Sequence, residues 1–252
     1  MSQQKTRGRG WLKGAVDLAV ILLVVTAAKT AIAEQFYVPS GSMEPTLLIG
    51  DELLATKYAY GYGTASLPVF VALPNTTRIM GALPKRGDVV VFRYPGDWSQ
   101  TWVKRVIGLP GDRIALHGGL VSINGTPVDI QPDGMGQLEN EDGSHVLAAR
   151  FIETLPGPRK HMIFKLAPNN PRDNMDEVVV PPDHLFVMGD NRDNSADSRV
   201  PLREGGVGLL PVANLVGRVD GIVGSWDLGI KSQPVWTWAS GLRLARFFSA
   251  VK

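Results

Sequence analysis

The chain has 252 residues, 44% of them hydrophobic and 20% charged, so it is long and apolar enough to bury a core, which argues against wholesale disorder. Its net charge of +2 is too small for a nucleic-acid-binding protein, and the absence of cysteine excludes disulfides, thiolate catalysis and cysteine-based metal sites. Glycine and proline are slightly over-represented, which favours a turn-rich β protein over a helix bundle.

An apolar stretch at residues 11–33 predicts one transmembrane helix. Its 23 residues would span roughly 30 Å of hydrocarbon, and Asp17 is the only charge between residues 14 and 28. A cleavable signal peptide ending at Ala31-Ile32-Ala33 and a buried core helix are the alternatives. Because motif-rich sequence follows the stretch immediately, a retained signal anchor is the favoured interpretation.

The tail before this stretch, residues 1–10, is basic. It carries Lys5, Arg7 and Arg9 and no acidic residue. The positive-inside rule therefore predicts a cytoplasmic N-terminus. In a bacterium this describes a single-pass protein of the inner (plasma) membrane, with its main domain on the periplasmic or extracytoplasmic side and the lipid bilayer as a partner.

Beyond residue 35, short apolar runs alternate with turn residues, as in β proteins. Strands are expected at Asp88–Phe92, Trp102–Ile107, Leu120–Ile123, Thr126–Ile130, His184–Met188 and Leu215–Val223. Asn124-Gly125 is typical of a type I′ hairpin turn. Residues 113–183 are polar and sparsely apolar, which predicts a smaller β-rich accessory region inserted into a β core of residues 34–112 and 184–235.

The tail at residues 236–252 interleaves aromatic and apolar side chains with basic ones, such as Trp238, Phe247 and Arg246. This pattern predicts an amphipathic C-terminal helix. Two environments fit it equally: the membrane interface, or the surface of the protein body.

The first segment with candidate catalytic residues is Pro39-Ser40-Gly41-Ser42-Met43-Glu44-Pro45-Thr46-Leu47. Two prolines fix the backbone and Gly41 permits conformations closed to other residues, so the segment predicts a rigid bend that presents a hydroxyl group. A serine nucleophile needs a base. None of the four histidines has a motif-like or ligand-like setting, so we expect no histidine base and no histidine-based metal site.

Lys104 is the candidate base. In a strand, Trp102, Lys104 and Val106 would share one face while Arg105 points to the other. If that face is buried, desolvation lowers the pKa of the lysine toward neutrality, which a general base requires. A solvent-exposed lysine on an edge strand is the alternative that the local sequence favours.

A third cluster, Gly189–Arg199, follows the apolar run at His184–Met188 and reads Gly-Asp-Asn-Arg-Asp-Asn-Ser-Ala-Asp-Ser-Arg. Calcium binding fits poorly, because the cationic Arg192 stands where an oxygen ligand would be needed. A polar loop that orients a base by hydrogen bonds fits better, and a solvated turn network is the alternative.

Together, four stretches in this order resemble the type I signal peptidases: Phe36–Asp51, Lys85–Pro95, Val103–Asp112 and Gly189–Arg199. The resemblance implies a signal-peptidase-like β catalytic core and a membrane-bound serine endopeptidase. Such an enzyme removes signal peptides from exported preproteins after small residues, in the pattern Ala-x-Ala, and binds them as an extended strand. It implies no metal and no cofactor, and we expect a monomer that does not bind nucleic acid.

The resemblance also assigns roles to residues. Ser42 would be the nucleophile and Lys104 the general base, with Ser40 in the oxyanion hole and Ser195 orienting Lys104. Asp197 and Arg199 would form a supporting ion pair. The expected substrate pocket is formed by Phe36, Val38, Pro39, Met43, Leu47, Trp102 and Val103. Trp102 stands where a smaller aromatic side chain is common in the family, which would narrow this pocket.

Three other functions compete with this one. A self-cleaving repressor with a Ser–Lys dyad would need an N-terminal helix-turn-helix, where this chain has its apolar stretch. A specialised relative that processes pilin or conjugation proteins fits the same motifs. A non-catalytic, membrane-anchored binding protein would have no use for Ser42, Lys104 and Ser195 in these contexts.

Overall fold

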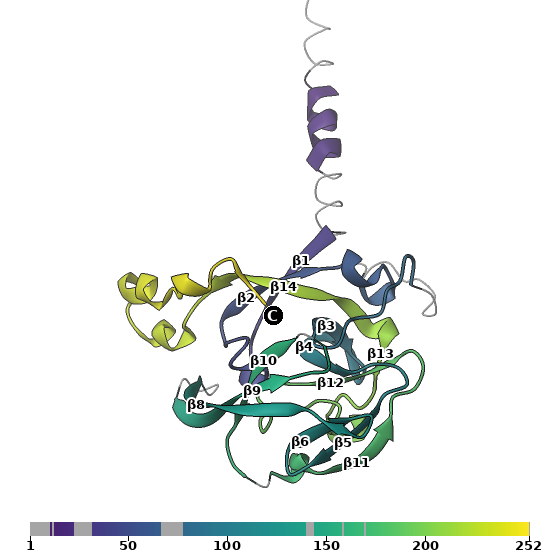
Figure 1. Cartoon of the computed structure of the whole chain (residues 1–252). Coiled ribbons are helices and arrows are strands. Elements are labelled where there is room, and N and C mark those ends of the chain that lie inside the picture. Colours follow the sequence, from purple (N-terminus) through teal and green to yellow (C-terminus); the bar gives the residue numbers. More distant parts are fainter. Residues whose placement is uncertain are drawn as a thin grey trace, which may run out of the picture.

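In a computed structural model, the chain folds into a mostly β protein with an N-terminal helical stretch that projects away from the body (Figure 1). The structure describes residues 11, 13–22, 32–66, 78–139, 144–157, 159–168 and 170–251. Residues 13–22 are helical. In the described part of the chain, no helix has both the length and the apolar character needed to cross a membrane. The basic tail lies outside the described residues, as do residues 12 and 23–31 of the expected anchor.

One large sheet organises the body. In spatial order its strands are β1 (Ala33–Tyr37), β2 (Asp51–Thr56), β14 (Leu215–Ser225), β3 (Val89–Tyr94), β4 (Asp97–Gly108), β12 (His184–Met188) and β13 (Leu210–Pro211), with β15 (Ser249–Ala250) paired to β14. Neighbouring strands are antiparallel throughout. The late strand β14 therefore lies between two early strands, β2 and β3.

Two smaller sheets lie entirely within residues 113–183. The four-stranded sheet has the order β11 (Met175–Val179), β5 (Arg113–His117), β6 (Leu120–Ile123) and β7 (Thr126–Pro127). The three-stranded sheet has the order β10 (Lys160–Lys165), β9 (His145–Thr154) and β8 (Asp129–Glu139). Figure 1 shows β5, β6 and β11 of the four-stranded sheet at the end of the body away from the N-terminal helical stretch.

The expected strands are all present, with shifted ends in several cases. The two predicted at Leu120–Ile123 and His184–Met188 have the observed bounds. The strand predicted at Thr126–Ile130 is divided into β7 and β8. Asn124 and Gly125 have φ angles of 54° and 80°, the positive values that a type I′ turn requires.

Short 3₁₀-helices connect the strands. They are η1 (Gly41–Met43), η2 (Tyr58–Tyr60), η3 (Thr64–Ser66), η4 (Pro171–Asp173), η5 (Leu202–Glu204), η6 (Val212–Asn214), η7 (Leu228–Ser232), η8 (Val235–Gly241) and η9 (Leu244–Arg246).

The single amphipathic helix expected at residues 236–252 is wrong. The segment forms η8, η9 and β15 instead, because its backbone bonds to the large sheet and to the chain that follows β14. Leu242 forms a β-bridge with Trp226, and the N–H group of Arg243 donates to the Ser225 carbonyl. A continuous helix would consume these same backbone groups internally.

Apolar side chains fill the spaces on both sides of the large sheet. One buried cluster joins Met43 and Leu47 to β2, β3 and β14. A second joins β4 and β12 to the four-stranded sheet, through residues such as Ile107, Leu116 and Phe186. The segment that carries Ser42 and the strand that carries Lys104 are therefore each packed against a rigid core.

Candidate active site

Ser42 lies in the middle of the 3₁₀-helix η1, which follows the extended residues Pro39 and Ser40. The turn is closed at its end by the Glu44 N–H group, which donates to the Gly41 carbonyl at 3.1 Å. It is also held from outside. The N–H group of Asn191 donates to the Ser42 carbonyl at 3.2 Å, and its side-chain amide donates to the Gly41 carbonyl at 3.1 Å. The backbone of the candidate nucleophile is thus fixed on both sides.

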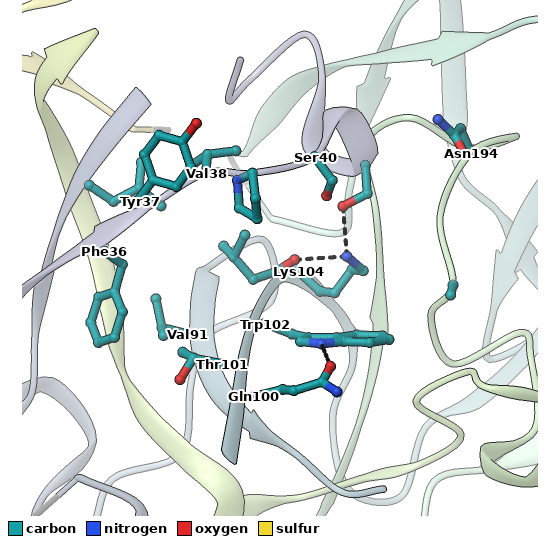
Figure 2. A pocket seen from close by; sticks show the side chains of 15 residues that line it. Phe36, Tyr37, Val38, Ser40, Val91, Gln100, Thr101, Trp102, Lys104 and Asn194 are labelled. Atoms are coloured by element: carbon teal, nitrogen blue, oxygen red, sulfur yellow. Dashed lines mark hydrogen bonds between the residues drawn. The ribbon is translucent and has the colours of Figure 1, made fainter. Parts of the chain in front are cut away.

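Lys104 lies on β4, an interior strand of the large sheet, between β3 and β12. It is only 4% exposed, so the alternative of a solvated edge-strand lysine is wrong. Its Nζ atom donates to Ser42 Oγ at 2.8 Å and to its neighbour's carbonyl, that of Val103, at 3.0 Å (Figure 2). Residues 42 and 104 are therefore brought into direct contact, the geometry that a nucleophile and its base require.

Burial lowers the pKa of Lys104 from 10.5 to about 8, because the ammonium form loses hydration. The negative charges of Asp197 and Asp190 oppose the shift, and the positive charge of Arg199 adds to it. The Trp102 ring lies under the amine, with its centroid 5.6 Å from Nζ. At neutral pH a usable fraction of Lys104 is therefore the free amine.

The expected supporting pair, Asp197 and Arg199, is present and almost fully buried. Arg199 binds the Asp197 carboxylate with two nitrogen atoms, at 2.9 and 2.8 Å. The pKa of Asp197 is lowered: Arg199 and the Gly189 N–H group outweigh the opposing effect of burial. This places a compensated negative charge near Lys104.

Ser195 is buried next to this pair, at 1% exposure. Its hydroxyl lies near enough to the Asp197 carboxylate to lower that group's pKa, but among the described residues its Oγ atom has no partner with full hydrogen-bond geometry. Lys104 Nζ is directed at Ser42 and at its neighbour's carbonyl rather than at Ser195. The orienting bond expected between Ser195 and Lys104 is therefore not made in this arrangement.

A pocket of about 510 Å³ opens in front of the Ser42–Lys104 pair. Five of the expected lining residues contribute to it: Phe36, Val38, Pro39, Trp102 and Val103. Ser40 also lines it, beside Ser42. The sequence analysis missed the remaining members, which are Tyr37, Leu53, Val91, Gln100, Thr101, Asn194 and Ala196.

Met43 and Leu47 do not line this pocket. Both are fully buried in the core behind the turn. In a 3₁₀-helix successive side chains point about 120° apart, so the residue after Ser42 cannot share its direction. Their contribution is to pack the turn against the sheet.

Two walls of the pocket face each other in Figure 2. Residues around Tyr37 approach from the end of β1, and residues Gln100 to Trp102 approach from β4. The Trp102 ring stacks on Tyr94, with centroids 4.1 Å apart and an interplanar angle of 6°, and its Nε1 donates to Gln100. These contacts hold the Trp102 ring in place on this side of the pocket.

A buried ionic network supports the site from behind, and the sequence analysis missed it. Arg105 binds both oxygen atoms of Asp190, at 2.9 and 2.7 Å. Arg192 binds both oxygen atoms of Glu153 on β9. His161 on β10 lies between the two carboxylates, 3.2 Å from Glu153 and 3.8 Å from Asp190, and burial lowers its pKa. The sequence pattern of the strands shows which residues share a face of a strand, but it does not show which charged residues of different strands form ion pairs.

The backbone of strand β10 also forms hydrogen bonds with the loop that contains Asp190 and Arg192. The Phe164 N–H group donates to the Asp190 carbonyl, and the Arg192 N–H group donates to the Phe164 carbonyl. Asp193 in turn accepts from the N–H groups of Leu166 and Ala167. The loop that holds the Ser42 turn is therefore itself held by the three-stranded sheet.

In the described part of the chain, no three His, Asp or Glu side chains gather into a group that could hold a metal ion.

Comparison with known proteins gives a consistent result. The family model described as "Signal peptidase, peptidase S26" matches residues 11–226. A Rickettsia akari (strain Hartford) protein named "Signal peptidase I" is 36% identical over 263 residues, covering 97% of this chain and 93% of its own length. The protein of the same name from Rickettsia typhi (strain ATCC VR-144 / Wilmington) is 37% identical, covering 90% and 89%.

A crystal structure of a signal peptidase I from Enterococcus faecalis V583 also matches. It has 23% sequence identity and a TM-score of 0.33, and the match covers 55% of this chain and 97% of that one. The family assignment rests on the sequence relatives.

Proposed function

This chain belongs to the signal peptidase family, peptidase S26, and we propose that it removes N-terminal signal peptides from exported preproteins as a membrane-bound serine endopeptidase. The observation that carries the proposal is the 2.8 Å hydrogen bond from Lys104 Nζ to Ser42 Oγ, in a pocket that both residues line. The burial of Lys104 supports its role as a base, because its pKa is lowered to about 8.

The proposed reaction has two halves. Neutral Lys104 takes the proton of Ser42 while Oγ attacks the scissile carbonyl carbon, and the electron pair of the carbonyl moves onto its oxygen. Ser40 supports this oxyanion with its hydroxyl, together with the backbone N–H group of Ser42. When the carbonyl re-forms, the C–N bond breaks, and the Lys104 ammonium returns the proton to the departing amine of the mature protein.

The second half releases the signal peptide. Neutral Lys104 takes a proton from a water molecule, whose oxygen attacks the acyl carbon of the Ser42 ester. Collapse of the second tetrahedral intermediate breaks the ester bond and returns the proton to Ser42 Oγ. The negative charge of buried Asp197 stabilises the ammonium form of Lys104 that arises in each half, and the positive charge of Arg199 limits this effect.

Selection of small residues follows from the pocket walls. An extended peptide fits between the end of β1 and the start of β4, with alternate side chains directed into the pocket. Trp102 is held in place by its stack on Tyr94 and therefore does not yield to a large side chain. An Ala-x-Ala sequence before the cleaved bond directs two small side chains, at alternate positions, into this pocket.

Membrane attachment is part of the same proposal. Residues 11–33 serve as the anchor, with the N-terminus cytoplasmic and the β domain outside the bacterial inner membrane. Exposed aromatic side chains on the C-terminal segment support additional contact with lipid, since Trp236 is 81% and Phe248 85% exposed. In the sequence Arg246 stands two residues before Phe248, and aromatic side chains interleaved with basic ones favour the interface between lipid headgroups and acyl chains.

The test is cleavage of a preprotein that has an Ala-x-Ala site by the detergent-solubilised full chain. The wild type is expected to cut it, and Ser42→Ala and Lys104→Ala are expected to be inactive while folded, as judged by circular dichroism. Activity that survives in one variant would overturn the role of that residue. An inactive wild type that cuts pilin-like or conjugation precursors would favour a specialised peptidase, and one that cuts nothing would favour a binding protein.

A further inference from the structure

Glu44, two residues after Ser42, is an acidic side chain in a place that does not suit a charge. It is completely buried. Its Oε2 atom accepts one hydrogen bond, from the N–H group of Glu139 at the end of β8, at 3.1 Å. Its Oε1 atom has no hydrogen-bond partner, and no cation is paired with Glu44, among the described residues.

The neighbours of Glu44 are predominantly acidic. Glu139 lies near it on β8 and Asp51 on β2, and among the described residues Arg243 of the C-terminal segment is the cation with the largest effect on it. Arg243 directs its own hydrogen bonds elsewhere, to the Glu139 carboxylate at 2.7 Å and to the Ile49 carbonyl at 2.7 Å. An ionised Glu44 would therefore be desolvated and repelled without an ion-pair partner.

A neutral carboxylic acid fits the same place well. A Cβ atom added to Gly41 would lie 3.1 Å from Glu44 Oε1 and 3.3 Å from the Glu139 carbonyl oxygen, so these two oxygen atoms lie against the same glycine. A proton on Oε1 gives Glu44 a donor on the side of this carbonyl, while Oε2 accepts from the N–H group of the same residue.

We propose that Glu44 is a positioning residue that, as a neutral acid, fastens the turn carrying Ser42 to the end of β8. Its backbone N–H group closes that turn onto the Gly41 carbonyl, so a displacement of Glu44 is passed directly to Ser42. Ionisation of Glu44 drives the side chain away from Glu139 and loosens the turn. The inference deepens the proposed peptidase function: it gives the reaction an alkaline limit that Lys104 alone does not impose.

The direction of the pH effect follows from the pKa. Burial and the charge of Glu139 raise the pKa of Glu44 from 4.5 to about 7, against the effects of the Glu139 N–H group and of Arg243. The stabilising contribution of Glu44 is thus complete below pH 4.5 and is lost as the pH rises through about 7. Lys104 works in the opposite sense, because the free amine becomes more abundant as the pH rises through about 8.

The experiment compares the wild type with Glu44→Gln, in which an amide imitates the neutral acid permanently. The control is Glu177→Gln, because Glu177 is 49% exposed on β11. In Glu44→Gln only Lys104 titrates, so kcat should rise roughly tenfold between pH 7 and pH 9. In the wild type and the control, the loss of neutral Glu44 should cancel most of that rise. Glu44→Ala should lower kcat at pH 7 and leave KM unchanged, because Glu44 does not line the pocket.

A second measurement does not depend on catalysis. The difference in thermal midpoint between Glu44→Gln and the wild type should be larger at pH 8.5 than at pH 5.5, while Glu177→Gln should follow the wild type at both. Equal pH profiles for Glu44→Gln and the wild type, or an equal difference in midpoint at both pH values, would overturn the proposal. If the wild type cleaves no preprotein, the peptidase function fails, and the thermal comparison still decides whether Glu44 is held neutral.

Discussion

The buried amine of Lys104 should make the protein less stable than an inactive variant in which it is replaced. Lys104→Met keeps most of the side-chain volume and removes the ionisable group. We expect this variant to lose all peptidase activity and to unfold less readily than the wild type at neutral pH.

The expected magnitude follows from the pKa. It falls from 10.5 to about 8 on folding, and each unit corresponds to about 1.4 kcal/mol, so the buried lysine destabilises the fold by about 3 kcal/mol at pH 7. Because Lys104 is only 4% exposed, solvent does not reduce this value greatly. The lost hydrogen bonds to the Val103 carbonyl and to Ser42 Oγ subtract about 1 kcal/mol each. A net gain of about 1 kcal/mol remains.

The sign of the pH dependence gives a sharper test. The unfolded chain binds more protons at this site than the folded chain between pH 8 and 10.5, so wild-type stability rises across that range. The advantage of Lys104→Met should therefore shrink by about 2.5 kcal/mol between pH 7 and pH 10. Urea denaturation of the full chain in detergent, followed by tryptophan fluorescence, measures the free energy of unfolding at each pH.

Lys85→Met is the matched control, because Lys85 is exposed. It should show no comparable change with pH. An advantage of Lys104→Met that stays constant from pH 7 to pH 10, or a variant less stable than the wild type at pH 7, would show that the amine is not held at a desolvation cost.

Three further predictions concern the surroundings of the site. In Gly189→Ala, the added methyl group would overlap the Ser42 carbonyl oxygen, so kcat should fall at least about tenfold and the free energy of unfolding by about 1–3 kcal/mol; wild-type kinetics would contradict the packing described. Glu153→Gln leaves the buried charge of Arg192 uncompensated and should lower the free energy of unfolding by about 3–5 kcal/mol in urea titrations, whereas methionine at both positions should restore much of it. Trp102→Ala should raise kcat/KM for precursors with leucine at a selected position relative to Ala-x-Ala precursors, and an unchanged ratio would mean that Trp102 does not set the size limit.

Local patterns in the sequence were sufficient for most of the β core. Apolar runs between turn residues marked the strands, and Asn124-Gly125 marked a hairpin, because these signals depend on neighbouring residues only. The contact between Ser42 and Lys104 could be anticipated only from the resemblance to a family, since nothing local links two residues on separate elements.

The features that the sequence analysis missed depend on long-range pairing. Glu153 and His161 stand in a polar stretch that resembles solvated surface, and only the docking of the three-stranded sheet turns them into buried partners of the loop at Asp190. Met43 was assigned to the substrate pocket from the resemblance to the family, but its side chain lies in the core, because successive side chains of a 3₁₀-helix point in different directions.

The position of β14 between β2 and β3 has a consequence for biosynthesis. Strand β2 follows the Ser42 turn, and strand β4 carries Lys104 and pairs with β3. Strand β14, which ends at Ser225, lies between β2 and β3 and joins them. A ribosome must therefore complete nearly the whole chain before the two halves of the active site can be aligned. We therefore expect a chain that still lacks β14 to have no peptidase activity toward its own apolar N-terminal stretch or toward a neighbouring nascent chain.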